Sequence, residues 1–182
     1  MCKYQDVQEK LYAEIMENAP SSDDHSFPMS LDLLNTMPYF NAFLKEVLRL
    51  YPPAAQINRD TGSEVTIKGI KIPAKTRVAI PIDLIQKHPD YWSNPDSFQP
   101  ERWLNDEFPA SNKNAYLPFT TGNRKCVGEY FAMCEAKLIL APLIRSFSFN
   151  FAPSCRNANF EITSFFLMKP KPDLKICLRS RP

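Results

Sequence analysis

The sequence predicts a single, mainly α-helical domain with two small β-sheets, an α+β fold. Its 182 residues, of which 44% are hydrophobic and 23% charged, are typical of an ordinary globular domain. Apolar residues recur at spacings of three and four in 4–18, 38–51 and 127–147, which is the pattern of a helix with one buried face. Short β-branched runs in 64–82 and alternating apolar residues in 148–180 predict the two sheets.

The first two helices are predicted from their apolar patterns and their boundaries. The helix at 4–18 has one apolar stripe, formed by Val7, Leu11, Ile15 and Met16. The polar segment ENAPSSDDHS then interrupts the helical pattern. The helix at 38–51 is expected to use Thr36 as its N-cap and Pro38 in its first turn, and to end before Pro52.

The two β-regions are separated by a long segment without regular periodicity. In 64–82 the runs EVTI, IKI and RVAIPI are divided by turn sequences at Lys68-Gly69 and Pro73-Ala74. Tryptophan, phenylalanine and proline recur through 88–118, so we expect an irregular meander held together by aromatic packing. The runs FSFNF, EITSFFLM and LKICL in 148–180 indicate the second β-region.

The longest predicted helix, 127–147, follows directly on a cysteine-containing loop at 119–128. Its apolar stripe is formed by Phe131, Cys134, Leu138 and Ala141. Pro142 lies inside this helix, where it removes a backbone donor and costs about 3 kcal/mol unless a kink absorbs the clash. We therefore predict a bend between Leu138 and Pro142.

Composition argues against several classes of function. The formal net charge is +2, without a long run of one sign, so nucleic acid is not an expected partner. The first residues are polar and amphipathic, so we expect no secretory signal, targeting segment or membrane anchor in this chain. The 5 cysteines form no C-x-x-C pair, which argues against a disulfide framework and a structural zinc site and favours a reducing compartment.

Cys126 differs from the other cysteines in its sequence surroundings. Cys134, Cys155 and Cys177 are expected to be small buried side chains. Cys126 follows Arg124 and Lys125 and precedes a predicted helix N-terminus, and both features stabilise a thiolate.

Three roles are possible for Cys126 on the basis of its sequence surroundings. It could be an inert buried thiol, or a nucleophile, which would need a positioned histidine. The chain has only His25 and His88, each in a polar loop. A lone thiolate also suits a metal that takes one protein ligand, and haem iron is the chief example.

The pattern Phe119-x-x-Gly122-x-Arg124-x-Cys126-x-Gly128 resembles the haem-ligand signature of the cytochrome P450 superfamily. Two further segments match motifs of that family in the expected order. Glu46-Val-Leu-Arg49 is similar to its E-x-x-R helix, and FQPERW, which contains Arg102, is similar to its meander motif. The hairpin and the meander look closest to eukaryotic microsomal members, and the resemblance implies the C-terminal part of the cytochrome P450 fold.

This resemblance also implies the roles of individual residues. Cys126 would be the catalytic residue and the axial ligand of the iron in haem b (heme, iron protoporphyrin IX). Further haem contacts are implied for Arg124 and Arg59 at the propionates, for Phe119 beside the sulfur, and for Gly122 and Gly128, whose backbone would take a positive φ or lie close to the flat ring. A structural network is implied for Glu46, Arg49 and Arg102, and a substrate pocket for Ala54, Ala55, Phe165 and Phe166.

The activity that the resemblance implies is monooxygenation. One oxygen atom from O2 would enter a small apolar organic substrate, with electrons from an external NADPH-dependent cytochrome P450 reductase. A full-length parent would lie at the cytosolic face of the endoplasmic reticulum membrane. The chain contains no segment that matches the family's distal haem helices, so we expect it to be inactive alone. The alternatives are a non-catalytic haem-binding or interaction fragment, and a thiol enzyme with Cys126 as nucleophile.

Overall fold

The helices and strands below come from a computed structural model that describes residues 1–19, 29–105, 113–155, 161–164 and 167–181. Its α-helices are α1 (Gln5–Asn18), α2 (Leu31–Thr36), α3 (Pro38–Leu50), α4 (Ile82–Ile85) and α5 (Glu129–Ser146). Its 3-10 helices are η1 (Pro100–Trp103), η2 (Lys113–Ala115), η3 (Gly122–Arg124) and η4 (Pro153–Cys155). Its strands are β1 (Gln56–Asp60), β2 (Val65–Ile67), β3 (Ile70–Ile72), β4 (Arg77–Pro81), β5 (Phe147–Phe151), β6 (Glu161–Ser164), β7 (Met168–Lys171) and β8 (Ile176–Ser180).

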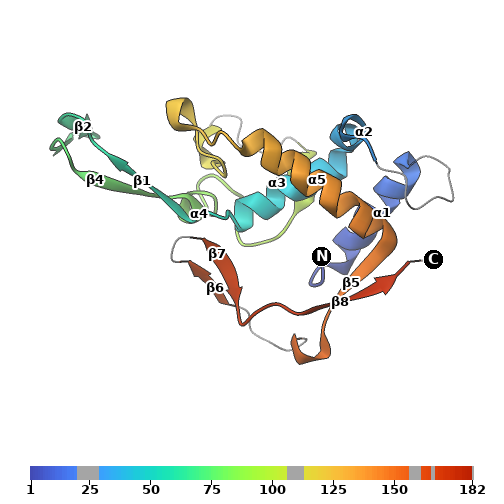
Figure 1. Cartoon of the computed structure of the whole chain (residues 1–182). Helices are drawn as coiled ribbons and strands as arrows, with labels where there is room; N and C mark the ends of the chain where they lie inside the picture. The colour runs from blue at the N-terminus through green and yellow to red at the C-terminus, as the bar shows by residue number, and fades with distance from the viewer. Residues whose placement is uncertain (20–28, 106–112, 156–160, 165–166, 182) are drawn as a thin grey trace.

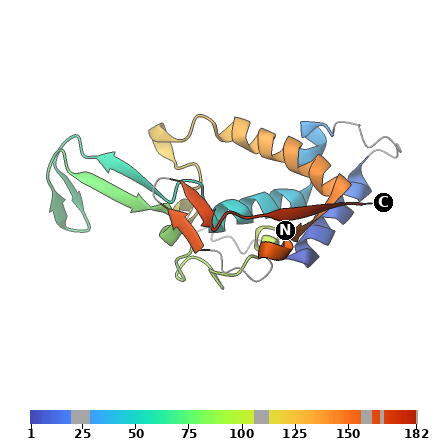
Figure 2. The same ribbon diagram turned by 60° about the horizontal axis from the view of Figure 1, so that its bottom comes forward.

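The strands pair only in antiparallel two-stranded sheets within the described residues: β1 with β4, β2 with β3, β5 with β8 and β6 with β7. The sequence predicted two small sheets, whereas the described residues form four two-stranded sheets, and β1 lies before the predicted segment 64–82. Figures 1 and 2 show the sheet of β1 and β4 extending away from the helices, while both chain ends lie on the opposite side beside α1. The predicted α+β fold class is confirmed.

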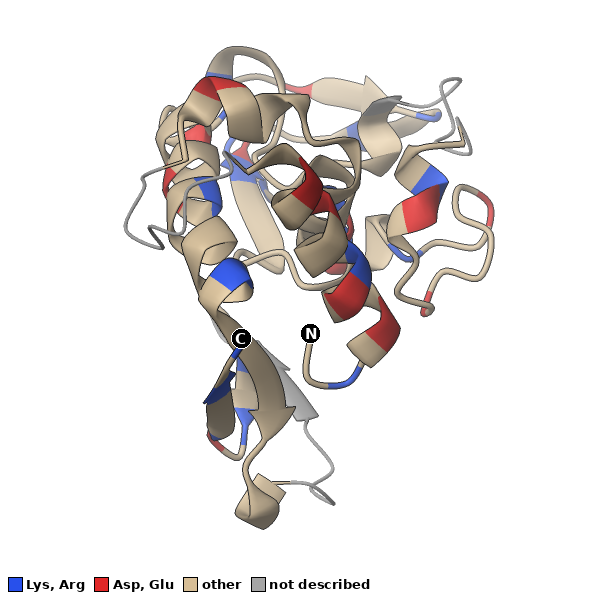
Figure 3. Ribbon diagram, turned by 90° about the vertical axis from the view of Figure 1, so that its right-hand side faces the viewer, with Lys and Arg blue, Asp and Glu red and all other residues tan. Residues whose placement is uncertain are grey.

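Helices α1, α3 and α5 pack around one hydrophobic core that also includes Leu34 of α2. The expected stripe on α1 is buried at Val7, Leu11 and Ile15, whereas Met16 is exposed. Burying such apolar side chains supplies most of the favourable free energy of folding. Among the described residues, no helix combines the length and the apolar character needed to cross a membrane. Acidic and basic residues are interspersed along the same helices (Figure 3).

The N-terminus of α3 is held by a side chain from α1. Glu14 accepts hydrogen bonds from the amides of Tyr39 (2.8 Å) and Phe40 (2.7 Å), which have no partner within the first turn. The expected N-cap was wrong, because Thr36 is the last residue of α2 and its hydroxyl donates to the carbonyl of Leu33. A carboxylate from a neighbouring helix therefore replaces a local cap and fixes α3 against α1.

The tip of the first β-region is a tight turn between β2 and β3. Lys68 has φ 48° and Gly69 has φ 81°, as a type I′ hairpin turn requires at both central positions. Strand β1 was not predicted, because QINRD lacks the alternation of a half-buried strand and its residues are mostly exposed. It pairs with β4 in a register that places Arg59 opposite Val78.

The long helix α5 begins directly after the cysteine loop and continues through Pro142 without interruption. Its described limits lie within the predicted segment 127–147, and a bend before Pro142 stays a prediction. Ala141 and Ile144 are buried in the core. The predicted stripe faces outward at Phe131, which is 70% exposed. An apolar face of α5 is therefore left uncovered by the described residues.

Candidate functional site

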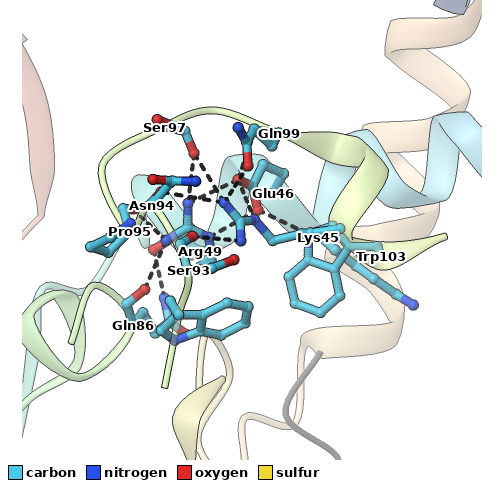
Figure 4. A network of polar contacts seen from close by, with 12 residues as sticks. Lys45, Glu46, Arg49, Gln86, Ser93, Asn94, Pro95, Ser97, Gln99 and Trp103 are labelled. Carbon is cyan, nitrogen blue, oxygen red and sulfur yellow. Dashed lines mark hydrogen bonds and ion pairs between the residues drawn. The ribbon is translucent and has the colours of Figure 1, made fainter. Parts of the chain in front are cut away.

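A buried carboxylate, Glu46 on α3, is the centre of a polar network between α3 and the meander (Figure 4). Arg49 lies one turn later and donates from Nε to Oε2 (2.9 Å) and from Nη2 to Oε1 (2.8 Å) of Glu46. Arg102 of η1 donates from Nε to Oε1 of Glu46 at 3.1 Å. All three side chains are 0–1% exposed, so the structure brings together the residues for which the sequence predicts a network.

Two further donors from the meander complete the shell of Glu46. The indole Nε1 of Trp103 donates to Oε2, and the amide of Gln99 donates to Oε1, each at 2.9 Å. Burial by itself would raise the pKa of Glu46, but the hydrogen bonds from Arg49, Gln99 and Trp103 outweigh burial and lower it. Glu46 is therefore an anion held by donors on every side.

The remaining guanidinium donors of this network bind backbone carbonyls of the meander and of Gln86, which follows α4. Arg49 donates to the carbonyls of Gln86 (3.0 Å), Pro95 (2.7 Å) and Ser97 (3.0 Å), as Figure 4 shows. Arg102 donates in the same way to the carbonyl of Ser93 at 3.0 Å. The network thus fastens a segment without regular secondary structure to α3, and it satisfies carbonyl groups that would otherwise be unpaired.

We predict that Arg49→Lys lowers the free energy of unfolding by about 2–4 kcal/mol, although it keeps the charge. An ammonium group cannot form the two parallel hydrogen bonds that the planar guanidinium group makes to Glu46. It also leaves carbonyl groups of the meander without donors. Urea denaturation measures the loss. The matched control is Arg77→Lys, because Arg77 forms an ion pair with Asp60 in which both side chains are exposed. That control should change stability by less than about 0.5 kcal/mol, and an equal effect of both substitutions would contradict the prediction.

The cysteine loop at 119–128 is closed by its own hydrogen bonds. The amide of Cys126 donates to the carbonyl of Phe119 at 2.9 Å, and the hydroxyl of Thr120 donates to the carbonyl of Arg124 at 3.0 Å. Gly122 has φ 73°, a left-handed conformation that favours glycine. These contacts present the Cys126 side chain, which is exposed, at the surface of the loop.

The closest glycine to the sulfur of Cys126 in sequence is Gly128, at the start of α5. Gly128 is the N-cap of α5, and a Cβ atom at this position would lie 3.8 Å from Sγ of Cys126. Its φ is −85°, so of the two expected uses of this glycine only a close approach to the flat ring stays a prediction. Arg124 is exposed, whereas Lys125 pairs with Glu129 at 2.6 Å. An exposed thiol, a glycine and an exposed arginine in one loop are residue types that suit the sulfur side of a haem.

The other residues implied for the site are dispersed over the fold. Arg59 lies on β1, is exposed and donates to the carbonyl of Asn58. Phe119 is half-buried at the start of the cysteine loop. Ala54 is half-buried and Ala55 is buried just after α3.

The second implied pocket segment lies partly outside the described residues, since Phe165 and Phe166 are not among them. The strand that follows them, β7, is among the described residues. The amide of Met168 in β7 donates to the carbonyl of Pro53 at 2.8 Å. The start of β7 therefore lies beside the segment that contains Ala54, although they are far apart in sequence.

The alternative site types receive no additional ligand or base from the described residues. His25 is outside those residues, and His88 contacts Asp90, with Nδ1 3.8 Å from Oδ2, and the ring of Tyr91. Over the described ranges, no group of three or more histidine, cysteine, aspartate or glutamate side chains is arranged to hold a metal ion.

Two side chains at the base of the network had no predicted role, Gln86 and Trp92. Both are almost completely buried, and Trp92 packs against Arg49, with the guanidinium carbon 5.0 Å from the ring centroid. Aromatic content predicts only that Trp92 packs inside the meander. A glutamine in the polar context LIQKHP carries no signal of burial, so Gln86 could not be selected from the sequence.

Comparison with known proteins agrees with the motifs. Residues 1–178 match the model of the family described as Cytochrome P450. Cytochrome P450 3A29 of Sus scrofa is 37% identical over 149 residues, covering 82% of this chain and 29% of that protein. Cytochrome P450 3A19 of Capra hircus aegagrus is 31% identical over 182 residues, covering 100% of this chain and 80% of that protein. Probable cytochrome P450 4ac1 of Drosophila melanogaster is 33% identical over 178 residues, which is 34% of its length.

Proposed function

This chain belongs to the cytochrome P450 family, and on that premise we propose that Cys126 binds the iron of haem b through its thiolate. The observation that carries the proposal is the exposed sulfur at the surface of a hydrogen-bonded loop, directly before the N-terminus of a long helix. The full-length protein would be a haem-thiolate monooxygenase.

The residues of the loop have separate tasks in this proposal. Cys126 supplies the axial ligand, and Gly128 leaves the sulfur uncovered by a side chain. Arg124 is suited to a propionate because its guanidinium can bind a carboxylate through two parallel hydrogen bonds, and Arg59 would serve the second propionate. Phe119 adds an apolar wall beside the sulfur and limits the approach of water. When bound, haem would supply the redox chemistry that activates O2.

The substrate and the partners of the full-length protein follow from family membership only. We propose an apolar organic substrate, electrons from an NADPH-dependent cytochrome P450 reductase, and a location at the endoplasmic reticulum membrane. Ala54 and Ala55, together with Phe165 and Phe166, would line part of the substrate pocket. The buried Ala55 and the contact between Met168 and Pro53 support a common location for the two segments.

A second candidate is a chain that holds haem, or contacts a partner, without turnover. One observation favours it for the chain alone: Val127, next to Cys126 in the chain, and Tyr130 and Phe131 in the first turn of α5 are exposed. Apolar side chains in such a group are normally covered. The chain spans 29% of the length of cytochrome P450 3A29, so monooxygenase activity is proposed for the full-length protein and not for this chain alone.

Haem titration combined with alkylation separates these proposals from a thiol enzyme. The purified chain is titrated with haem, treated with iodoacetamide, and analysed by mass spectrometry for the modified cysteines. We expect haem to protect Cys126, while Cys177, which is also exposed, is alkylated at the same rate with and without haem. Unchanged alkylation of Cys126 in the haem complex would contradict ligation by this residue. Rapid alkylation of Cys126 without haem uptake would instead support a nucleophilic cysteine.

A further inference from the structure

The side chain of Gln86, at the C-terminal end of α4, joins segments that are distant in sequence. It is 0% exposed. Its Nε2 donates to the carbonyls of Leu48 (2.9 Å) and Arg49 (3.0 Å), which belong to the last turn of α3. Its Oε1 accepts the amide of Leu117 at 2.7 Å. One buried amide thus satisfies carbonyls at the end of a helix and a backbone donor at the entrance to the cysteine loop.

Gln86 is also in direct contact with the Glu46 network. Its backbone carbonyl accepts the hydrogen bond from Nη1 of Arg49, which Figure 4 shows beside Glu46. The main chain of Gln86 therefore binds the Arg49 side chain, while its own side chain binds the Arg49 main chain. This double connection fixes the position of Gln86 relative to α3 and orients its Oε1 toward Leu117.

Residues 115–117, which are separated from the cysteine loop by one residue, are each held by a hydrogen bond to another part of the fold. The indole Nε1 of Trp92 donates to the carbonyl of Ala115 at 3.3 Å. The hydroxyl of Tyr116 donates to the carbonyl of Lys45 on α3, also at 3.3 Å. The amide of Leu117 is bound by Gln86. We call the segment formed by residues 115–117 the loop anchor.

The loop anchor is connected to the backbone of Cys126 through the main chain of residues 117–120 and two backbone hydrogen bonds. The carbonyl of Leu117 accepts the amide of Thr120 at 3.0 Å. The carbonyl of Phe119, two residues after Leu117, accepts the amide of Cys126 at 2.9 Å. A displacement of Leu117 would therefore shift the carbonyl group that orients the backbone of Cys126.

We propose that Gln86 is a positioning residue for Cys126, which it holds in place through Leu117 and the loop anchor. The claim that Gln86 aids haem ligation rests on the proposed function. The claim that Gln86 fixes the position of the cysteine loop does not. Glutamine suits the position because it offers two donors and an acceptor on one side chain, and each is used. An apolar residue would leave buried backbone groups at both α3 and Leu117 without partners.

The test compares Gln86→Met, which keeps the length but removes the polar atoms, with Gln8→Met as a matched control. Gln8 is also 0% exposed, and its amide binds the backbone carbonyl and amide of Phe149 in β5. Both substitutions remove a buried glutamine that bridges a helix to a distant backbone, so both should lower the global stability. Only Gln86→Met should act on the loop.

Amide hydrogen exchange, followed residue by residue by NMR at a temperature well below unfolding, reports the local effect. In Gln86→Met we expect the amides of Leu117 and Cys126 to exchange at least about tenfold faster, as the loss of one buried hydrogen bond implies. In Gln8→Met both amides should keep the rates of the unmodified protein. Equal rates for both amides in Gln86→Met and the unmodified protein would overturn the proposal.

A second variant keeps the proposal testable if Gln86→Met does not fold. Gln86→Glu retains an acceptor for Leu117, so the amide of Leu117 should stay protected while the last turn of α3 exchanges faster. Loss of protection at Leu117 in this variant would contradict the assigned contact. Because exchange is measured without haem, failure of haem binding overturns the proposed function and leaves the positioning result intact. A protein that binds haem yet shows no loop effect overturns only the role of Gln86.

Discussion

Replacing Glu46 with glutamine is expected to lower the free energy of unfolding by about 3–5 kcal/mol, a large part of the stability of a domain of this size. The substitution preserves the shape of the side chain but removes its charge. The guanidinium groups of Arg49 and Arg102 would then lie in the core without their anion. One oxygen of Glu46 would also be replaced by a donor that faces the donors already present.

The measurement is urea denaturation followed by circular dichroism, with Glu9→Gln as the control. Glu9 forms a bidentate pair with Arg181, in bonds of 2.7 and 2.9 Å, so the chemical change is the same. Its side chain is 57% exposed, and such a pair contributes at most about 1 kcal/mol. A loss below about 1 kcal/mol in Glu46→Gln would show that the network does not stabilise the fold as its geometry implies.

The contribution of the Glu46 network to stability should also depend on pH. The pKa of Glu46 is lower in the folded protein than its ordinary value, because the hydrogen bonds of Arg49, Gln99 and Trp103 outweigh the effect of burial. Its stabilising contribution is therefore complete above the pKa of the unfolded carboxyl and is lost as the pH falls through the folded pKa. Stability measured between neutral pH and pH ~3 should fall less steeply in Glu46→Gln than in the unmodified protein, since that group no longer titrates.

Replacing Cys126 with serine is expected to abolish thiolate ligation while leaving the fold intact. A serine hydroxyl is not deprotonated at neutral pH and cannot replace the thiolate. The side chain of Cys126 is exposed, so its substitution removes no core contact and should change stability by less than about 0.5 kcal/mol. The haem retained after gel filtration and the urea midpoint are measured in parallel. Loss of both haem and stability would indicate a structural role for Cys126.

The two substitutions should therefore have separate effects, one on the stability of the fold and the other on haem ligation. Glu46→Gln removes stability without changing the ligand, and Cys126→Ser removes the ligand without changing stability. Glu46 is 0% exposed within the contact between α3 and the meander, whereas Cys126 lies on an exposed loop. The intervening structure is the loop anchor held by Gln86 and Trp92.

The sequence predicted structure best where an apolar pattern extends over several helical turns or where a motif specifies several residues close together. The helices α1, α3 and α5 follow from apolar spacing, because their buried faces must repeat with the helical period. Helix α2 (Leu31–Thr36) escaped prediction because 6 residues are too few to show a period, although the hydroxyl of Ser30 caps it by accepting a hydrogen bond from the amide of Leu33. Strand β1 escaped because its pairing with β4 is fixed by the fold and not by its own side chains.

The candidate site was predictable to the extent that its residues lie in local motifs. Family resemblance selected Cys126 and Glu46 from short patterns in the sequence. The same motif selected Gly128, two residues after Cys126. The role of Gln86 depends on a contact that no local pattern expresses, because its side chain binds the amide of Leu117, which is distant in sequence.

The spectrum of the reduced haem complex with carbon monoxide tests the central claim, that Cys126 is the thiolate ligand of haem iron. The purified chain, Cys126→Ser and the control Cys177→Ser are each reconstituted with haem, reduced and exposed to carbon monoxide. We predict a red-shifted Soret band in the unmodified chain and in Cys177→Ser, and its loss in Cys126→Ser. The same band position in all three proteins, or no haem uptake by any of them, would contradict the proposed site.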